Sequence, residues 1–194
     1  MDAMHASDGL DLPTRHRFTL DDVIAMVRAG VIPEESRMEL IDGELIDMMP
    51  IGPGHDGLVS GLTHALVRAC GGNGIVRVQS TLRLGPQDAP QPDFLVVRPR
   101  ADFYTTRHPG PADTLLVVEV AESSLRYDRT VKLPLYARAG VPEYWIVDLK
   151  NRVLSAYRSP SADGYAPPTT HKPGERLALH AAPGIVVPLD LVFA

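Results

Sequence analysis

Two carboxylate side chains interrupt stretches of sequence that are otherwise apolar. Asp93 opens the apolar run in QPDFLVV, and Glu119 lies within LLVVEV. An ionised carboxylate in apolar surroundings is costly unless a cation, a hydrogen-bond network or a raised pKa compensates for it. Two such carboxylates on interior strands therefore indicate a cation that both of them share.

A lysine is the third candidate for this site. Lys132 follows Glu119 by thirteen residues at the start of a predicted helix, and Tyr136 lies one turn later on the same helix face. Only three of the 19 basic residues are lysines. A guanidinium is a poor substitute for a compact ammonium charge, which gives a reason for a lysine at this position.

Each of these residues also has a purely structural interpretation. Asp93 follows Pro92 and can be a turn residue, Glu119 can pair with an arginine, and Lys132 can be a solvated helix lysine. Their conjunction makes a functional role more plausible for all three residues.

Hydrophobic periodicity and turn signals predict the elements that must hold these residues. Thr19 is a helix N-cap with Asp22 three residues later, and Asp42-Gly43 is typical of a tight hairpin turn. Residues 159–170 are expected to form a loop. We expect helices over residues 20–29, 55–69 and 128–140, and strands over residues 75–84, 94–97, 115–120, 143–148, 152–158, 176–179 and 185–187.

Periodicity also predicts which way several side chains point. In the helix over 55–69, His55 begins the apolar face and His64 faces solvent. Pro134 must lie in the first turn of its helix or kink it, since proline has no N–H to donate. Tyr144 and Trp145 are expected in the core. The stretch 75–84 alternates strictly, which places four aliphatic residues on one strand face: Val76, Val78, Leu82 and Leu84.

The interleaved helices, strands and hairpins predict an α/β or α+β fold with a mixed sheet. The length of 194 residues and a hydrophobic content of 44% are typical of a single domain over residues 1–194, with a loose segment at 1–17 and terminal strands within 161–194. One cysteine, Cys70, excludes a disulfide framework and fits a reducing cytoplasm. No apolar run is long enough for a membrane span.

The chain resembles the Uma family of restriction endonuclease-like proteins, which belong to the PD-(D/E)xK nuclease superfamily. The resemblance covers residues 18–160 and rests on MELIDGEL, a GH at a helix start, QPDFLVV, LLVVEV and, most specifically, DRTVKLPLYARAGVPEYWIVD. It implies a three-layer α/β/α core with a mixed central sheet and added hairpins. It also implies a metal site at Asp93 and Glu119 and magnesium-dependent hydrolysis of phosphodiesters. With a strand carbonyl such as that of Val120 and with water, these two carboxylates would supply the oxygen ligands that Mg²⁺ prefers.

Two positions depart from the pattern of these relatives. Their superfamily usually has a lysine two residues after the glutamate, where this chain has Ala121, so Lys132 takes that role by resemblance. Where the family tends to have EVLSPS, this chain has EVAESS, which brings Glu122 near the site. Glu122 is either a further ligand or a surface charge.

Other residues have weaker assignments. His55 is a supporting residue near the metal or a buried structural histidine, and Tyr136 is a supporting residue beside Lys132. Glu44 reaches the same cleft or forms a surface ion pair. Because arginine suits bidentate contacts to phosphate, four arginines are candidates for nucleic-acid contacts: Arg77, Arg83, Arg126 and Arg129.

The sequence thus favours an endonuclease that hydrolyses DNA with Mg²⁺, or with Mn²⁺ in its place. A catalytically inactive module of the same fold that binds DNA or a protein partner is the alternative, and a different phosphoester hydrolase with the same ion is a third. A homodimer would suit cleavage of both strands. The net charge of −5 argues against non-specific coating of nucleic acid. Motifs of zinc peptidases, P-loop proteins, dinucleotide-binding proteins and nucleophile-elbow hydrolases are missing from the sequence.

Overall fold

The structure is a computed structural model, and it describes residues 15–48 and 52–193. Of the segment expected to be loose, residues 1–14 lie outside this part. The helices are α1 (Leu20–Arg28), α2 (Pro53–Cys70), α3 (Leu125–Tyr127) and α4 (Leu133–Arg138). The strands are β1 (Met38–Ile41), β2 (Glu44–Asp47), β3 (Ile75–Val78), β4 (Phe94–Val97), β5 (Thr114–Ala121), β6 (Glu143–Asp148), β7 (Val153–Arg158), β8 (Thr169–His171), β9 (Arg176–Leu179) and β10 (Ala182–Pro188).

Six strands form the central sheet in the order β3-β4-β5-β6-β7-β8. Strands β5 and β6 run parallel, and every other neighbouring pair is antiparallel. A parallel pair needs a crossover connection, and α3 and α4 supply it. The sheet is therefore mixed, as the sequence predicts.

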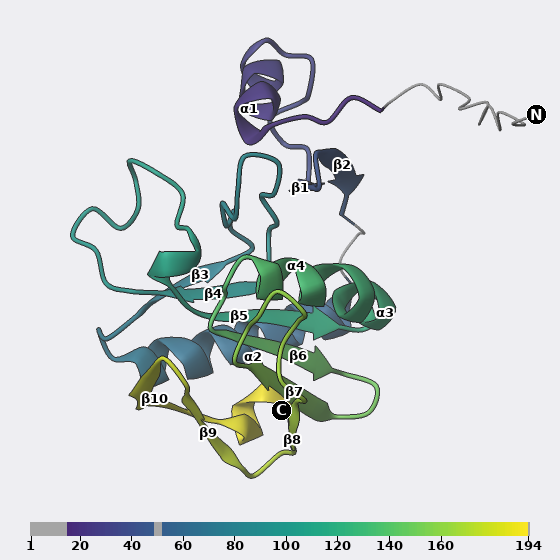
Figure 1. Cartoon of the computed structure of the whole chain (residues 1–194). Helices are drawn as coiled ribbons and strands as arrows, with labels where there is room; N and C mark the ends of the chain where they lie inside the picture. Colours follow the sequence, from purple (N-terminus) through teal and green to yellow (C-terminus); the bar gives the residue numbers. More distant parts are fainter. Residues whose placement is uncertain (1–14, 49–51, 194) are drawn as a thin grey trace, which may run out of the picture.

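Helical segments cover both faces of this sheet (Figure 1). On one face, α2 and the β9–β10 hairpin bury one core cluster; on the other face, α3 and α4 bury a second. Strand β5 contributes to both clusters because alternate side chains point to opposite faces. Tyr144 and Trp145 are fully buried, one in each cluster. The predicted three-layer α/β/α architecture is confirmed, and no helix among the described residues is long and apolar enough to cross a membrane.

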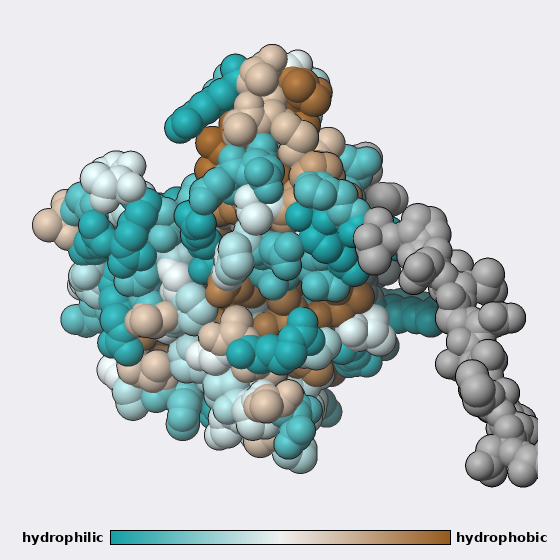
Figure 2. Space-filling model, turned by 45° about the horizontal axis from the view of Figure 1, so that its top comes forward, coloured by the Kyte–Doolittle hydropathy of each residue, from teal (hydrophilic) through white to brown (hydrophobic). Residues whose placement is uncertain are grey.

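The β1–β2 hairpin and α1 form a small unit beside the sheet (Figure 1). Asp42 and Gly43 both have positive φ, 51° and 71°, as the tight turn predicted at this dipeptide requires. Thr19 caps α1 and exchanges hydrogen bonds with Asp22, which confirms the predicted capping box. Leu40 of β1 packs against α1. Figure 2 shows hydrophobic residues exposed around α1 and a second group of them across the middle of the same face, among hydrophilic residues.

The predicted strand over residues 75–84 is wrong beyond Val78, where β3 ends. Gln79 has a φ of 44°, which breaks the pleat and reverses the alternation that follows. Val76 and Val78 consequently pack against the cluster on the α2 side, whereas Leu82 is buried in the cluster on the opposite side. The four aliphatic residues therefore do not share one face.

The predicted helix over residues 128–140 is a composite. It begins earlier, at α3, continues through a π-helical turn at Asp128–Lys132 and ends with α4. Pro134 lies in the first turn of α4, as required of a residue without an N–H. The amide of Leu133 donates to the carbonyl of Asp128, five residues back, so the wider turn accommodates the proline.

Strands β8 and β10 also differ from the prediction. The expected loop at 159–170 is interrupted by β8, an exposed edge strand that pairs with β7. Strand β10 is longer than the predicted 185–187 and contains a bulge. Strand β8 could not be predicted because it lacks a buried face whose alternating pattern would reveal it.

Gly43→Ala should destabilise the protein more than Gly140→Ala. Both glycines have positive φ, 71° and 76°, so an alanine at either position costs about 1–2 kcal/mol in conformation. A Cβ at Gly43 would also lie 2.7 Å from the Cβ of Arg17, whereas one at Gly140 meets nothing within 4 Å. Urea denaturation measures both free energies of unfolding, and equal losses would contradict this packing at the hairpin turn.

Candidate active site

The pairing of β4 with β5 brings the two predicted carboxylates together. Phe94 pairs with Val118, so the next position along the ladder places Asp93 opposite Glu119. Their exposed fractions are 7% and 4%. The amide of Val120 donates to Asp93 Oδ2 at 2.8 Å, and the amide of Asp93 lies 3.4 Å from Glu119 Oε2. Two acids that are 26 residues apart in sequence thus share one buried location.

Lys132, at the end of the π-helical turn, contacts Glu119 and a third acid, Glu39. Its Nζ donates to Glu119 Oε1 and to Glu39 Oε1, at 2.9 Å in both cases. The hydroxyl of Tyr136, four residues later, donates to the same Glu119 oxygen at 3.0 Å. The predicted proximity of Glu119, Lys132 and Tyr136 is therefore present in the structure.

The sequence analysis missed Glu39, which is only 3% exposed. Its Oε1 accepts hydrogen bonds from Lys132 Nζ and from the amide of Gln91 at 2.7 Å. Cross-strand pairs place Glu39, opposite Ile46, on the same hairpin face as Glu44, opposite Ile41. MELIDGEL therefore indicates a hairpin face with two glutamates. The sequence pattern alone does not tell which of the two reaches the sheet.

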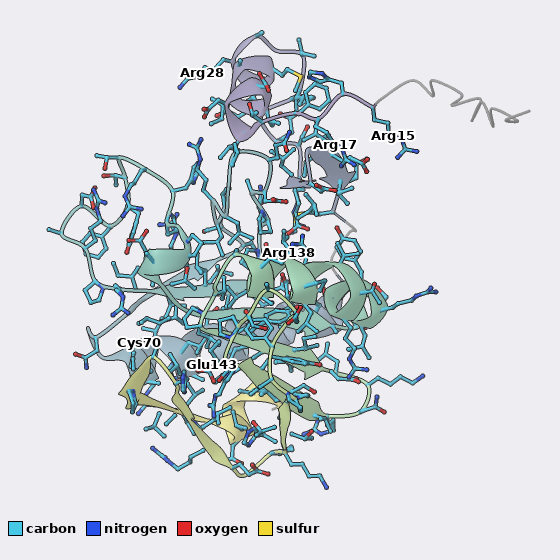
Figure 3. All side chains as sticks on the ribbon, viewed as in Figure 1. Arg15, Arg17, Arg28, Cys70, Arg138 and Glu143 are labelled. Carbon is cyan, nitrogen blue, oxygen red and sulfur yellow. The ribbon has the colours of Figure 1, made fainter. Side chains whose placement is uncertain are left out.

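Glu44 does not reach the cavity that holds the acids. It lies beside the hairpin turn and pairs with Arg15 at 3.4 Å and Arg17 at 3.5 Å, both labelled in Figure 3. Its side chain is 40% exposed. Of the two interpretations given to Glu44, the surface ion pair is confirmed, and its placement as a supporting site residue is wrong.

The buried cluster contains more acidic than basic groups. Asp128, also missed from the sequence, is 2% exposed and accepts a hydrogen bond from Ser124 Oγ at 2.7 Å. Its position one helical turn before Lys132 was the available signal. With Asp93, Glu119 and Glu39 it makes four buried carboxyl groups around one ammonium group, within the described residues.

This imbalance affects the pKa values of the cluster. Burial raises the pKa of Glu119 well above its ordinary value, although Lys132 opposes the shift. Burial alone would lower the pKa of Lys132, but Glu119 and Glu39 outweigh it, so the ammonium form is strongly favoured. Burial also raises the pKa of Asp128, to about 6. The acidic groups of the cluster outnumber its one ammonium group, so a bound cation would be electrostatically favoured there.

His55, in the first turn of α2, contacts Asp93 Oδ1, the oxygen that does not accept from the amide of Val120. Its Nε2 lies 3.1 Å from Asp93 Oδ1. The hydrogen bond to Asp93 raises the pKa of His55, although burial opposes this. The predicted inward orientation of His55 and the solvent exposure of His64 are both present in the structure.

An open cavity of about 510 Å³ lies over these groups. The hairpin, the start of α2, the end of β5 and the π-helical turn contribute its lining. Glu122 lines it with an exposed side chain and makes no hydrogen bond or ion pair with another described residue. The lining side chains with polar groups are Arg37, Glu39, Asp47, His55, Asp93, Glu119, Glu122, Ser123, Ser124, Tyr127, Asp128 and Lys132.

The four arginines predicted to contact nucleic acid do not line this cavity. Arg77 donates to the carbonyl of Phe103 at 3.4 Å, and Arg83 lies 3.4 Å from Asp21. Arg126 and Arg129 are exposed on the helical segment next to the cavity. Among the described arginines, Arg37 is the one that lines it.

The donor set can be tested against the implied magnesium ion. Within residues 15–48 and 52–193, no three His, Cys, Asp or Glu side chains form a metal-ligating group. Mg²⁺ needs only one or two carboxylates, however, because water and substrate phosphates complete its shell. Glu119 Oε2 has one weak partner, the amide of Asp93 at 3.4 Å, so a buried carboxylate oxygen is available. The residues therefore fit the ion.

Comparisons with known proteins identify the family and the fold of this chain. The Uma2 family model, described as "Putative restriction endonuclease", matches residues 22–191. A solved structure from Anabaena variabilis, titled as a putative nuclease belonging to DUF820, superposes with a TM-score of 0.65. It is 17% identical, and the match covers 91% of this chain and 97% of that chain. At this identity the likeness shows the fold alone. A comparison with curated proteins gives no match.

Glu39→Ala should destabilise the protein far more than Glu44→Ala. Loss of Glu39 removes buried hydrogen bonds from Lys132 and Gln91, which should cost about 2–4 kcal/mol. Loss of Glu44 removes exposed ion pairs worth at most about 1 kcal/mol. The two variants change the same residue type on the same hairpin face. Urea denaturation in metal-free buffer should separate them, and similar losses would contradict the buried pairing of Glu39.

Asp128→Asn should become more stabilising, relative to the wild type, as the pH rises from 4 to 7. A carboxyl whose folded-state pKa is raised loses stability as the pH rises from its unfolded to its folded value, here from 3.8 to about 6. The relative gain should reach up to about 3 kcal/mol near pH 7. Denaturation of both proteins across this pH range with a chelator present tests it, and a constant difference would contradict the raised pKa.

Proposed function

This chain belongs to the Uma2 family, described as putative restriction endonucleases, and we propose that it is a Mg²⁺-dependent endonuclease that hydrolyses DNA phosphodiester bonds. One observation carries the proposal. Asp93 and Glu119 lie side by side under an open cavity, with the ammonium group of Lys132 in hydrogen-bonding contact with Glu119. Membership in the family supports nuclease activity. The residues of the site support Mg²⁺ as the ion and phosphodiester hydrolysis as the reaction.

Asp93 and Glu119 would hold the magnesium ion. When bound, the ion supplies a Lewis acid that polarises a phosphoryl oxygen and lowers the pKa of the attacking water. Hard carboxylate oxygens match this ion better than nitrogen or sulfur ligands would. The excess of buried carboxyl groups over Lys132 gives the same location an electrostatic preference for a cation.

Lys132 would stabilise charge rather than accept a proton. Its raised pKa keeps it as an ammonium ion, which has no lone pair with which to act as a base. Two of its three N–H donors are directed to Glu39 and Glu119. The third can donate to the attacking water or to a phosphoryl oxygen as negative charge builds up on it.

The remaining polar groups orient the ligands. The amide of Val120 fixes Asp93 Oδ2, and His55 lies against Asp93 Oδ1. Tyr136 fixes the Glu119 oxygen that also accepts from Lys132. Held by hydrogen bonds from three elements, the two carboxylates lose little further conformational freedom when they bind an ion, which is the condition for an efficient preformed site.

A plasmid-nicking assay tests the proposal. The wild-type protein should nick supercoiled DNA in Mg²⁺ or Mn²⁺ and lose this activity in a chelator. Asp93→Asn, Glu119→Gln and Lys132→Met should each lower the nicking rate by at least about 100-fold, as expected for groups acting at the reacting phosphate.

Asp113→Asn is the matched control. Asp113 is partly buried, directly precedes β5 and accepts hydrogen bonds from Arg107 at 2.6 and 2.8 Å, outside the cavity. This variant should nick DNA at the wild-type rate. Nicking that survives all three site substitutions would contradict the catalytic assignment. Metal-dependent DNA binding without nicking by the wild type would instead identify the inactive binding module, and hydrolysis restricted to small diesters would identify a different phosphoester hydrolase.

A further inference from the structure

A second cavity, of about 620 Å³, adjoins the one above the acids. Glu122 lines both cavities. The lining of the second cavity includes Gly54 and Gly57 of α2, Glu122, Lys150, Arg152 and Phe193. A chain-like ligand that occupies the first cavity can therefore extend into the second by passing Glu122.

The parallel pairing of β5 with β6 explains why the two cavities are neighbours. Ala121 and Asp148 are paired at the ends of these strands, and the amide of Leu149 donates to the carbonyl of Ala121 at 3.1 Å. The carboxyl ends of parallel strands meet at the same sheet edge. The turn after β6, which carries Lys150, consequently lies next to the end of the strand that carries Glu119.

Two exposed cations from this turn line the second cavity. Lys150 is one of only three lysines in the chain, and it makes no hydrogen bond or ion pair with another described residue. Arg152 is held in place: it donates to the carbonyl of Phe193 at 2.5 Å, and its guanidinium lies 5.9 Å from the centre of the Phe193 ring. Two positive side chains, Lys150 and Arg152, therefore line this cavity with one negative side chain, Glu122.

The start of α2 lines the second cavity, and two glycines there leave the helix backbone uncovered by side chains. A Cβ added at Gly57 would meet nothing within 4 Å, and one at Gly54 would meet only Glu122 Oε1 at 3.8 Å. Packing therefore does not require either glycine. Gly57, past the first turn of α2, costs about 1 kcal/mol relative to alanine. Close approach of a ligand to the backbone is a reason to retain both glycines.

We infer that the second cavity binds the phosphodiester backbone of the DNA strand next to the bond that is cut. Lys150 and Arg152 contact the flanking phosphate, and the open first turns of α2 let that phosphate approach. The inference rests on the proposed function, because it continues the path of the same substrate. It assigns substrate binding to two residues that have no contact with Asp93, Glu119 or Lys132.

The test compares DNA binding with small-substrate hydrolysis. Fluorescence anisotropy with a labelled DNA duplex in Ca²⁺ gives the Kd at several salt concentrations, and bis(para-nitrophenyl) phosphate in Mn²⁺ reports the chemistry without a flanking phosphate. The Lys150→Ala/Arg152→Ala variant should raise the Kd by about 10-fold or more and lower the salt slope by about 2, one per lost phosphate contact. Hydrolysis of the small diester should stay within about twofold of the wild type.

The matched control is the Lys172→Ala/Arg28→Ala variant, which removes an exposed lysine and an exposed arginine from outside both cavities. Arg28 lies at the end of α1 (Figure 3). This control should bind the duplex like the wild type. If the Arg152 substitution disturbs folding through Phe193, Lys150→Glu alone provides the test. The Lys150 side chain bonds to no described residue, and the reversed charge should weaken DNA binding more than removal of the charge would.

Three outcomes would overturn the inference, and they can be distinguished from one another. Wild-type affinity and salt slope in both the double variant and Lys150→Glu would remove the second subsite and leave the nuclease proposal intact. A wild-type protein that hydrolyses the small diester but binds no duplex would overturn DNA as the substrate, and the flanking contact with it. An equal loss of small-diester hydrolysis in folded variants would also overturn it, because the residues would then act on the chemistry itself.

Discussion

The ion pairs of Lys132 with Glu119 and Glu39 connect three distant parts of the chain. Glu39 comes from the N-terminal hairpin, Glu119 from a central strand and Lys132 from the crossover helix. Removing such charges from water costs several kcal/mol per ion, and apolar residues of similar volume often stabilise a protein equally well. Stability alone therefore gives little reason to retain this arrangement. A requirement for charge at this location, such as phosphoester chemistry, gives a better one.

The same interaction determines what the site can accept. An ammonium group held between two carboxylates keeps its proton, and so its role is limited to charge and hydrogen bonding. The carboxyl groups around it remain in excess, with burial opposing the ionisation of Glu119. A divalent cation would offset this excess of acidic groups, and carboxylate oxygens are the ligands that a small hard ion prefers. The electrostatics of the cluster thus favour a small hard ion.

Sequence reasoning succeeded where local pattern and strand pairing are sufficient. An apolar run makes a lone acid conspicuous, so Asp93 and Glu119 could be found, and adjacent strands brought them together. Glu39 could not be assigned, because its 93-residue separation from Lys132 makes the contact a property of how the hairpin docks on the sheet. The break at Gln79 is similar: the residue adopts a φ of 44°, which no alternating pattern reveals.

The position of the lysine follows from the same geometry. Ala121 lies on the same face of β5 as Glu119, since the two are separated by two residues, and it is buried among the residues that pack under α4. Its small side chain leaves the space beside Glu119 to groups that enter from the helix above. The wide turn at Asp128–Lys132 directs Lys132 into that space, while Tyr136 bonds to the same carboxylate oxygen. A lysine on the helix thus reaches the Glu119 carboxylate, which a side chain at position 121, on the same strand face, would also approach.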